Sequence, residues 1–190
     1  MSHFYLSHPQ VKIDPAVPVP DWGLSDIGAA RARVAAAANW TSAVARIVSS
    51  AERKAIETAE IIAAARGLVV EIRPRTHEND RSATGFLPPP EFERVADEFF
   101  ARPHESVRGW ERAADAQSRI VGEVDAAVAM GGGNVLFVGH GGVGTLLQCH
   151  VAGGPIARIR DQPPGGGNVF AFSWRPRALA HGWRALEDIA

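Results

Sequence analysis

Two hydrophobic patterns alternate along the chain, one of short continuous apolar runs and one of longer stretches in which apolar residues recur at helical spacing. The first run covers His3 to Leu6 and ends near Pro9, because proline interrupts a buried strand. Similar runs predict further strands at residues 46–49, 68–72 and 134–138. The last of these is nearly all apolar, which is typical of a parallel strand covered on both faces.

Helical spacing fills the intervals between these runs. Ser25 is placed as an N-cap before an alanine-rich segment, and Gly67 supplies a C-terminal stop for the next helix. The predicted helices run from Asp26 to about Ala38, from Ala51 to Gly67, from after Ser106 to the Gly131–Gly133 stop with Trp110 as the first buried residue, and onward from the Gly139–Gly144 turn. Residues 10–23 and 76–90 are rich in proline or polar residues, so they predict long loops.

Near the C-terminus, residues 169–174 and 183–186 predict an antiparallel hairpin that turns at Ala180-His181-Gly182. We hypothesise that the edge of this hairpin, with Trp174 and Trp183, joins two copies of the chain in a homodimer. Strands that alternate with helices predict an α/β fold, a three-layer α/β/α sandwich with a mostly parallel central sheet. We expect residues 1–190 to form a single domain, because no repeat or change of composition divides them.

Composition and charge narrow the possible partners. The chain of 190 residues is 46% hydrophobic and 22% charged, which is ordinary for a water-soluble protein. Its formal net charge of -1 gives no reason to expect nucleic acid or an anionic membrane as a partner. The single cysteine, Cys149, excludes an internal disulfide and gives a thiolate metal site no second ligand. We see no signal peptide or membrane-spanning run, so we expect a cytoplasmic protein.

Two histidines follow predicted strands, His8 after the first strand and His140 after the strand at 134–138. Ligands of open α/β sheets bind beyond the carboxyl ends of the strands. The two histidines would therefore share one edge of the sheet if their strands are neighbours. A single histidine in such a place is commonly structural, but two in equivalent places favour a function.

The Gly139–Gly144 turn has the G-x-G-x-x-G spacing of a dinucleotide site, which would indicate a nucleotide-dependent oxidoreductase. That interpretation needs a ribose-binding acid about 20 residues further on, at the end of a strand. Asp161 has the distance but stands in a loop beside Pro163. We favour a turn whose backbone N–H groups, with Gly141 among them, and helix N-terminus bind an anion. A tight turn without any ligand is the simpler alternative.

Charged residues near two other strand ends are further candidates. Arg53 lies in the first turn of the helix that follows Ser49-Ser50. The helix dipole disfavours a cation there, so Arg53 is easier to understand if it binds a phosphate, although a solvated surface arginine is the alternative. In the loop after the third strand, any of His77, Glu78 or Asp80 could act as a general acid.

Taken in order, these segments make the chain resemble the histidine phosphatase superfamily, which is phosphoglycerate mutase-like in fold. The matching segments are Ser7-His8-Pro9, Leu24-Ser25-Asp26-Ile27-Gly28, Ser49-Ser50 through Arg53 to Thr58-Ala59, Glu78, and Val138-Gly139-His140-Gly141-Gly142. The resemblance covers nearly the whole chain. It implies a phosphatase that hydrolyses phosphoric monoesters without a metal or a cofactor.

The resemblance also implies a role for each matching residue. His8 would attack phosphorus and form a phosphohistidine, while His140 would hold the phosphoryl oxygens. Glu78 would protonate the leaving oxygen and then help water to cleave the phosphohistidine. The phosphate-binding set would be Arg53, Ser7 and Gly141.

Two positions depart from the family pattern, because Ser7 stands where the family has arginine and Pro9 where it has glycine. A serine offers one neutral hydrogen bond in place of several charge-assisted ones, each worth about 1.5–3 kcal/mol. Lys12, Arg31 or Arg81 could supply the missing charge. Two functions therefore stay open. One is a phosphatase for a small phosphorylated metabolite or a phosphoprotein, and the other is a catalytically impaired phosphate-ligand binding or regulatory protein of the same fold.

Substrate specificity is expected to lie in residues 78–110, which would overhang the edge of the sheet. The residues of this stretch that could line a substrate cleft are Arg81, Phe86, Phe92 and Trp110. The two last-named aromatic residues fit better as core residues of their helices. The run from Pro155 to Asn168 would cover the other side of the site or form a flexible surface loop.

Overall fold

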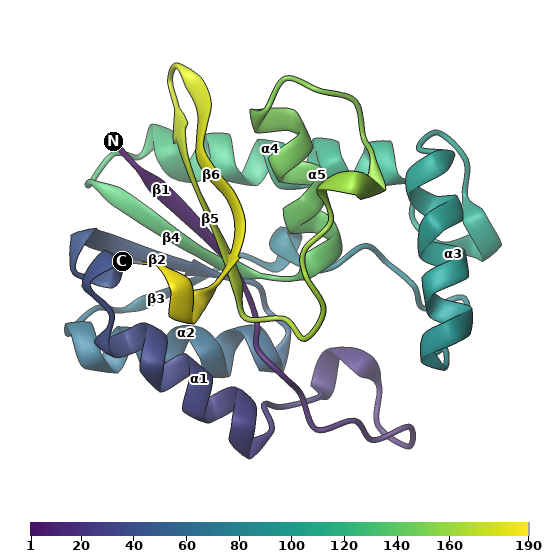
Figure 1. Cartoon of the computed structure of the whole chain (residues 1–190), viewed down its shortest axis with the longest axis horizontal. Helices are drawn as coiled ribbons and strands as arrows, with labels where there is room; N and C mark the ends of the chain where they lie inside the picture. The colour runs from purple at the N-terminus through teal and green to yellow at the C-terminus, as the bar shows by residue number, and fades with distance from the viewer. Residues whose placement is uncertain (190) are drawn as a thin grey trace.

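The computed structural model describes residues 1–189, and its strands form one sheet in the order β3-β2-β4-β1-β5-β6 (Figure 1). The strands are β1 (His3–Ser7), β2 (Val44–Ser49), β3 (Val70–Ile72), β4 (Asn134–Gly139), β5 (Asn168–Trp174) and β6 (Arg177–Ala185). The first four run parallel to one another, whereas β5 is antiparallel to β1 and β6 is antiparallel to β5. The prediction of a mostly parallel sheet is confirmed.

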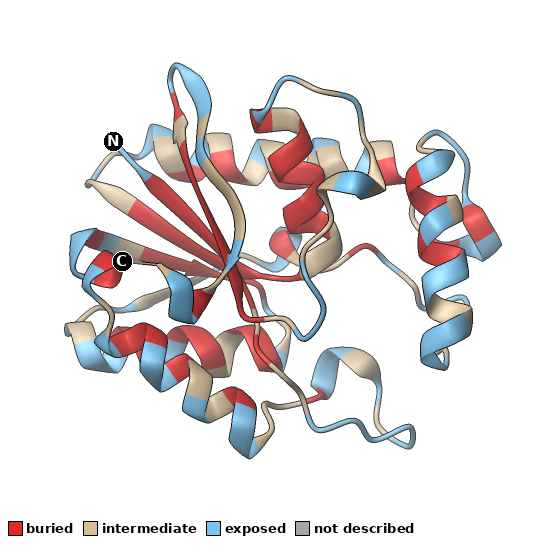
Figure 2. Cartoon of the chain, in the orientation of Figure 1, coloured by how far each residue is buried: buried red, intermediate tan, exposed pale blue. Residues whose placement is uncertain are grey.

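Helices cover both faces of this sheet, as Figure 1 shows. They are α1 (Asp26–Ala37) and α2 (Arg53–Arg66) on one face and α4 (Ala113–Ala129) and α5 (Gly141–Val151) on the other, whereas α3 (Pro89–Ala101) stands away from the sheet. Side chains alternate between the faces of a strand, so Leu6 is buried with α1 and α2, while Tyr5 is buried with α4 and α5. Figure 2 shows the buried strands between these helical layers. The predicted three-layer α/β/α sandwich is confirmed.

Local sequence signals set the ends of the first two helices. The Ser25 hydroxyl accepts a hydrogen bond from the Gly28 N–H at 3.1 Å, so Ser25 caps α1 as predicted. Gly67 ends α2 with φ 65° and ψ 30°, a left-handed conformation that glycine adopts without strain. α3 begins at Pro89, slightly before the predicted end of the loop. Proline suits the first turn of a helix, where an N–H has no partner within the helix.

The prediction for the start of α4 was wrong at Trp110. The helix begins at Ala113, and Trp110 follows a short 3-10 turn at Val107–Gly109. Its indole N–H donates to the Thr84 hydroxyl at 2.8 Å. Trp110 therefore joins the 76–88 loop to the core from outside the helix, and the helical spacing that included it was coincidental.

The predicted hairpin exists, but its turn was placed wrongly. β5 and β6 are joined at Arg175-Pro176, and β6 passes through Ala180–Gly182 with His181 paired to Ala171. At Gly182, β6 passes close to α5, because a Cβ at this position would lie 3.3 Å from the Gln148 side-chain oxygen. Within residues 1–189, no helix has both the length and the apolar character needed to cross a bilayer.

Candidate active site

The two predicted histidines lie side by side at the carboxyl edge of the sheet. β1 and β4 are parallel neighbours with Ser7 paired to Gly139, so the residue after each strand reaches the same place. The rings of His8 and His140 meet edge to face, with their centroids 5.3 Å apart. Two residues that are distant in sequence thus form one site.

His8 is held as a neutral imidazole with one free nitrogen. Its Nδ1 lies 2.8 Å from the Pro9 carbonyl oxygen. A carbonyl can only accept, so this contact assigns the proton to Nδ1 and leaves the lone pair on Nε2. Burial lowers the pKa of His8 to about 4 against the opposing effect of the Pro9 carbonyl, and the charges of Lys54 and Arg81 act with burial. His8 is therefore unprotonated at neutral pH, as a nucleophile must be.

His140 is fixed through both its backbone and its ring. Its N–H donates to the Tyr5 hydroxyl at 3.1 Å, and that hydroxyl lies 3.2 Å from the His140 carbonyl oxygen. The ring Nε2 lies 2.8 Å from the Ser50 hydroxyl and 3.3 Å from a Glu52 carboxylate oxygen. Burial lowers the pKa of His140 to about 4, although Glu52 and Glu78 both act to raise it.

The glycines of the 139–144 turn make room for protein groups. A Cβ at Gly139 would lie 2.4 Å from the Tyr5 hydroxyl oxygen, and one at Gly144 would lie 2.5 Å from the Tyr5 ring. These positions must be glycine because the aromatic ring packs against the turn. The G-x-G-x-x-G spacing therefore has a packing explanation, and the oxidoreductase interpretation that rested on it has no support left.

Glu78 occupies the anion site that the turn predicts. Its carboxylate accepts hydrogen bonds from the Gly142 N–H at 3.1 Å and the Val143 N–H at 2.9 Å, at the start of α5. The other acid candidates lie differently, since the Ser82 N–H binds the Asp80 carboxylate and lowers its pKa. His77 turns its Nδ1 to the Glu78 carbonyl. Glu78 is thus the loop acid that reaches the histidine turn.

Ser7 faces the Pro155–Asn168 run. Its hydroxyl lies 2.5 Å from the Gln162 side-chain oxygen and accepts from the Asn168 N–H at 3.1 Å. The Gln162 amide reaches Gly141, where an added Cβ would lie 2.1 Å from the Gln162 nitrogen. Polar neutral groups thus surround the position where the family pattern has arginine, and the Pro155–Asn168 run packs onto the site.

Arg53 is not brought to the site, contrary to the prediction. Its side chain is 64% exposed and pairs with Glu57 on the same helix at 2.7 Å. The neighbouring Lys54 is the buried cation, with 4% of its side chain exposed. Its ammonium group lies 2.5 Å from a Glu52 carboxylate oxygen and 2.7 Å from the Val19 carbonyl oxygen. Arg53, the first residue of α2, thus points outward, and Lys54, the second, points inward.

Glu52 adds a carboxylate that the sequence reasoning missed. Besides its contacts with Lys54 and His140, it accepts a hydrogen bond from the Glu78 N–H at 2.9 Å. Burial alone raises the pKa of the Glu52 carboxyl, but His140 and Lys54 outweigh burial and lower the pKa to about 2. Glu52 is therefore a fixed negative charge beside His140. A glutamate followed at once by basic residues after a strand end was the signal that could have found it.

Of the three cations proposed to replace the family arginine, only Arg81 is near the site. Lys12 is exposed, and Arg31 pairs with Glu187 at 2.6 Å. The Arg81 guanidinium lies over the Phe92 ring, 5.0 Å from its centroid. It has no ion-pair or hydrogen-bond partner within residues 1–189. Burial is the main cause of the low pKa of His8, and the positive charge of Arg81 adds a smaller lowering.

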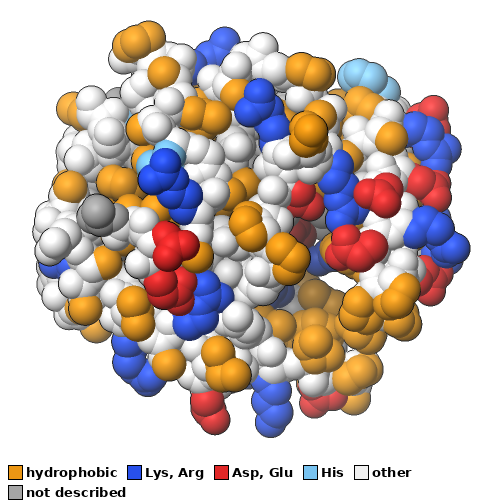
Figure 3. Space-filling model, viewed as in Figure 1, with side chains coloured by type: hydrophobic (Ala, Val, Ile, Leu, Met, Phe, Trp, Pro, Cys, Tyr) orange, Lys and Arg blue, Asp and Glu red, His pale blue; other side chains and the backbone are white. Residues whose placement is uncertain are grey.

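A cavity of about 950 Å³ adjoins Glu52 and Glu78. It lies between the segment around Pro18–Trp22 and the 77–93 region, and Figure 3 shows the surface hollowed between the body of the molecule and α3. Arg81 and Phe86 line it, as the sequence suggested. Phe92, which was expected rather in the core, lines it too, and Trp110 is buried against Phe92.

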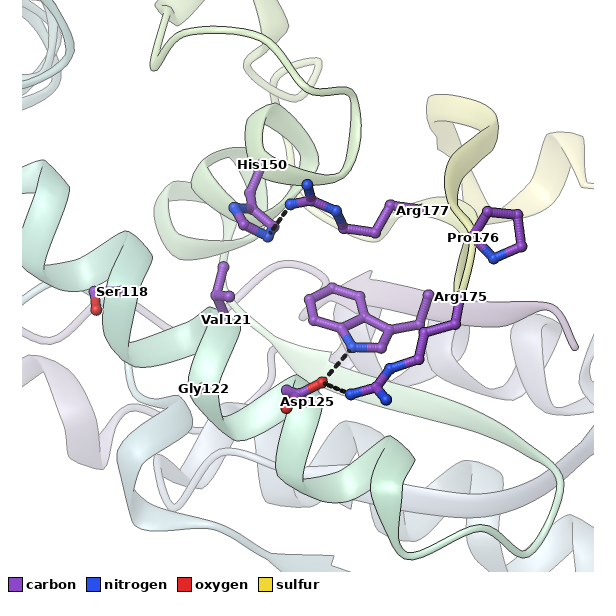
Figure 4. A pocket seen from close by; sticks show the side chains of 9 residues that line it. Ser118, Val121, Gly122, Asp125, His150, Arg175, Pro176 and Arg177 are labelled. Atoms are coloured by element: carbon purple, nitrogen blue, oxygen red, sulfur yellow. Dashed lines mark hydrogen bonds and ion pairs between the residues drawn. The ribbon is translucent and has the colours of Figure 1, made fainter.

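A second cavity of about 580 Å³ lies among α4, α5 and the turn of the β5–β6 hairpin (Figure 4). Its polar groups pair with one another, Arg175 with Asp125 at 2.8 Å and Arg177 with His150 at 2.5 Å. None of the predicted site residues, all of which lie in the described part of the chain, lines this cavity. Side chains of residues 1–189 form no group of three or more potential metal ligands.

Comparison with known proteins gives the site a family context. The model of the histidine phosphatase superfamily (branch 1) matches residues 14–180. The matched span thus covers Glu52, Glu78 and His140 and begins after His8. No curated protein matches the chain.

Solved structures match over nearly the full length. The mycobacterial glucosyl-3-phosphoglycerate phosphatase in complex with inorganic phosphate is 22% identical with a TM-score of 0.81, over 99% of both chains. Phosphoserine phosphatase of Entamoeba histolytica in complex with 3-phosphoglyceric acid is 15% identical with a TM-score of 0.78, over 99% of both chains. YhfR of Bacillus stearothermophilus is 22% identical with a TM-score of 0.76, over 100% of this chain and 98% of that one. At these identities the likeness shows a shared fold.

Proposed function

The chain belongs to the histidine phosphatase superfamily, and on that premise we propose that it hydrolyses phosphoric monoesters through a phosphohistidine at His8. The observation that carries this proposal is the state of His8. Its Nδ1 proton is bound to the Pro9 carbonyl, its pKa is low, and His140 stands beside it. A neutral imidazole with a free nitrogen, beside a second histidine at the carboxyl edge of the sheet, is suited to attack phosphorus.

The reaction would proceed in two displacements. In the first, the Nε2 lone pair of His8 forms a bond to phosphorus while the ester P–O bond breaks, and the leaving oxygen takes a proton from Glu78. In the second, water attacks the phosphohistidine, Glu78 takes a proton from that water, and the N–P bond breaks to release phosphate. Glu78 lies at the N-terminus of α5, between the turn and the cavity, where it can serve both steps.

Charge on the phosphoryl oxygens would be stabilised by His140 and Arg81. The His140 ring faces the ring of His8, and Arg81 lines the adjoining cavity without a counter-ion among the described residues. Arg81 would then provide the guanidinium that the family pattern carries next to the nucleophile. We propose a small phosphorylated metabolite or a phosphoprotein as the substrate, without a metal or cofactor.

A second candidate function is favoured by Ser7. Its hydroxyl is engaged with Gln162, so position 7 gives the phosphoryl group no positive charge and no free donor. This fits a catalytically impaired protein that binds a phosphorylated ligand and has a regulatory role.

Hydrolysis of p-nitrophenyl phosphate from pH 4 to 8, with EDTA present, separates the two candidates. We expect activity that persists in EDTA and falls to background in His8→Ala. Rapid quenching followed by mass spectrometry should find an alkali-stable phosphoryl group on His8. Wild-type activity equal to that of His8→Ala, together with binding of orthophosphate, would instead support the ligand-binding candidate.

A further inference from the structure

The cavity beside Glu78 has a wall of apolar and aromatic side chains. Two of them, Trp22 and Phe86, come from separate loops and meet with ring centroids 5.6 Å apart. Leu87 and Phe92 continue the wall toward α3. Phe86 is 38% exposed, so this wall presents part of an aromatic ring to the cavity.

This wall is held in place before any ligand binds. The indole N–H of Trp22 points to the carbonyl oxygens of Asp14 and Val17, at 2.9 Å from each. On the other side, Phe92 packs against Trp110 with ring centroids 5.9 Å apart. A preformed apolar surface binds an apolar group without first losing conformational entropy.

The charges that line the cavity select against a second anionic group. Of the described lining residues, Arg81 is the only lysine or arginine, whereas the carboxylates are those of Glu52, Glu78, Asp80 and Glu93. If Arg81 binds the phosphoryl group, a carboxylate or second phosphate elsewhere on the substrate would meet carboxylates alone. Neutral leaving groups avoid this repulsion.

From these observations we infer that the preferred substrates are monophosphate esters of uncharged, aromatic or bulky apolar alcohols, whose leaving group lies against Trp22 and Phe86. The inference rests on the proposed function for the position of the phosphoryl group at His8. The volume of about 950 Å³ lies within the range of pockets that hold ligands of drug-like size. Small polyanionic substrates such as phosphoglycerates would leave the apolar wall uncovered.

Calorimetric binding of two non-hydrolysable probes tests this specificity without requiring turnover. The probes are 1-naphthylmethylphosphonate, which carries an aromatic group, and 3-phosphonopropionate, which carries a carboxylate. We expect the naphthyl probe to bind at least about tenfold more tightly to the wild-type protein, because it buries apolar surface and adds no second charge. Phe86→Ala should weaken the naphthyl probe about fivefold and leave 3-phosphonopropionate unchanged, while Phe86→Leu should retain most of the affinity.

Val69→Ala is the control, because Val69 is another exposed apolar residue and does not line the cavity. Equal binding of the two probes, preference for 3-phosphonopropionate, failure of both to bind, or equal weakening of both by Phe86→Ala would overturn the inference. Selective naphthyl binding without hydrolysis of 1-naphthyl phosphate would refute the proposed phosphatase function and leave the ligand class standing. Hydrolysis of 3-phosphoglycerate in preference to 1-naphthyl phosphate would support the proposed phosphatase function and refute the inferred class of substrate.

Discussion

The turns that lead into α2 and α5 occupy equivalent places at the carboxyl edge of the sheet, yet each holds a glutamate in a different way. At α5, neutral backbone N–H groups of Gly142 and Val143 bind Glu78. At α2, the Lys54 ammonium binds Glu52. Protonation of Glu52 would leave the Lys54 ammonium buried without its partner, whereas Glu78 has no cationic side-chain partner among the described residues.

This difference separates a group suited to proton transfer from a group suited to fixed charge. Both carboxylates lie close to His140, and they are joined through the Glu78 N–H, which donates to the Glu52 carboxylate. A phosphoryl group bound at His8 would meet a proton carrier on the α5 side and a permanent negative charge on the α2 side. Substitutions at Lys54 and Glu52 therefore test how the α2 side balances its charges, and a substitution at Arg81 tests the cation of the adjoining cavity.

The largest effect is expected at Lys54. Lys54→Met keeps the length of the side chain but leaves Glu52 buried without its counter-ion, so the free energy of unfolding should fall by about 3–5 kcal/mol. Arg53→Met, at the preceding residue, removes an exposed ion pair and should change the free energy of unfolding by less than about 0.5 kcal/mol. Urea unfolding of both variants at neutral pH measures the difference. Similar losses in the two would contradict the assignment of Lys54 as the buried cation.

The same pair of residues shows where sequence reasoning reached its limit. The pattern predicted the strand, the helix after it and a cation in the first helical turn. Neighbouring residues of a helix point about 100° apart, so either Arg53 or Lys54 can face inward but not both. Because both residues are basic, the sequence does not indicate which of them is the buried one. Glu52 was missed for a related reason. Its place before two basic residues could have marked it as a candidate, but only the folded turn brings it to His140, which lies in a distant part of the sequence.

The other predictions follow the same rule: most of those that rest on local signals were right, and those that depend on a tertiary partner were wrong or incomplete. Apolar runs and caps predicted the sandwich, because burial and helix ends have local signals. The hairpin turn was misplaced because Gly182 accommodates Gln148, which lies on another element. The glycine turn was recognised as an anion site, but the anion proved to be the Glu78 carboxylate, which a long loop brings there. Tertiary partners of this kind are not encoded in any single segment.

Arg81 should show the next largest effect, this time on catalysis. Arg81→Met retains packing on Phe92 but removes the guanidinium, so kcat/KM for p-nitrophenyl phosphate should fall about 10- to 100-fold, as expected for loss of a charge-assisted hydrogen bond. Arg94→Met, on the exposed side of α3, is the matched control and should retain wild-type kinetics. Unchanged kcat/KM in Arg81→Met would mean that another group binds the phosphoryl oxygens.

A change in the opposite direction is expected at Glu52. Glu52→Gln preserves the shape and removes the negative charge beside His140, so orthophosphate should bind about tenfold more tightly. Isothermal titration calorimetry at neutral pH, below the unfolding temperature of the variant, measures the dissociation constant. Glu60→Gln removes the same charge from an exposed position on α2 and should leave binding unchanged. Equal or weaker phosphate binding by Glu52→Gln would show that the carboxylate does not oppose the phosphate.

The smallest effect is a pH dependence of stability that originates at His140. Its pKa is about 4 in the folded protein and about 6.5 in an unfolded chain, so the unfolded state binds the proton more tightly. Stability is therefore lost as the pH falls below about 6.5, and His140 alone should lower the free energy of unfolding by about 0.7 kcal/mol between pH 7 and pH 6. Urea unfolding at the two pH values should show a smaller difference in His140→Asn and an unchanged one in His104→Asn, whose histidine is exposed. If His140→Asn keeps the full wild-type difference, the buried ring of His140 is not neutral in the folded protein, and the fixed charge of Glu52 holds it protonated instead.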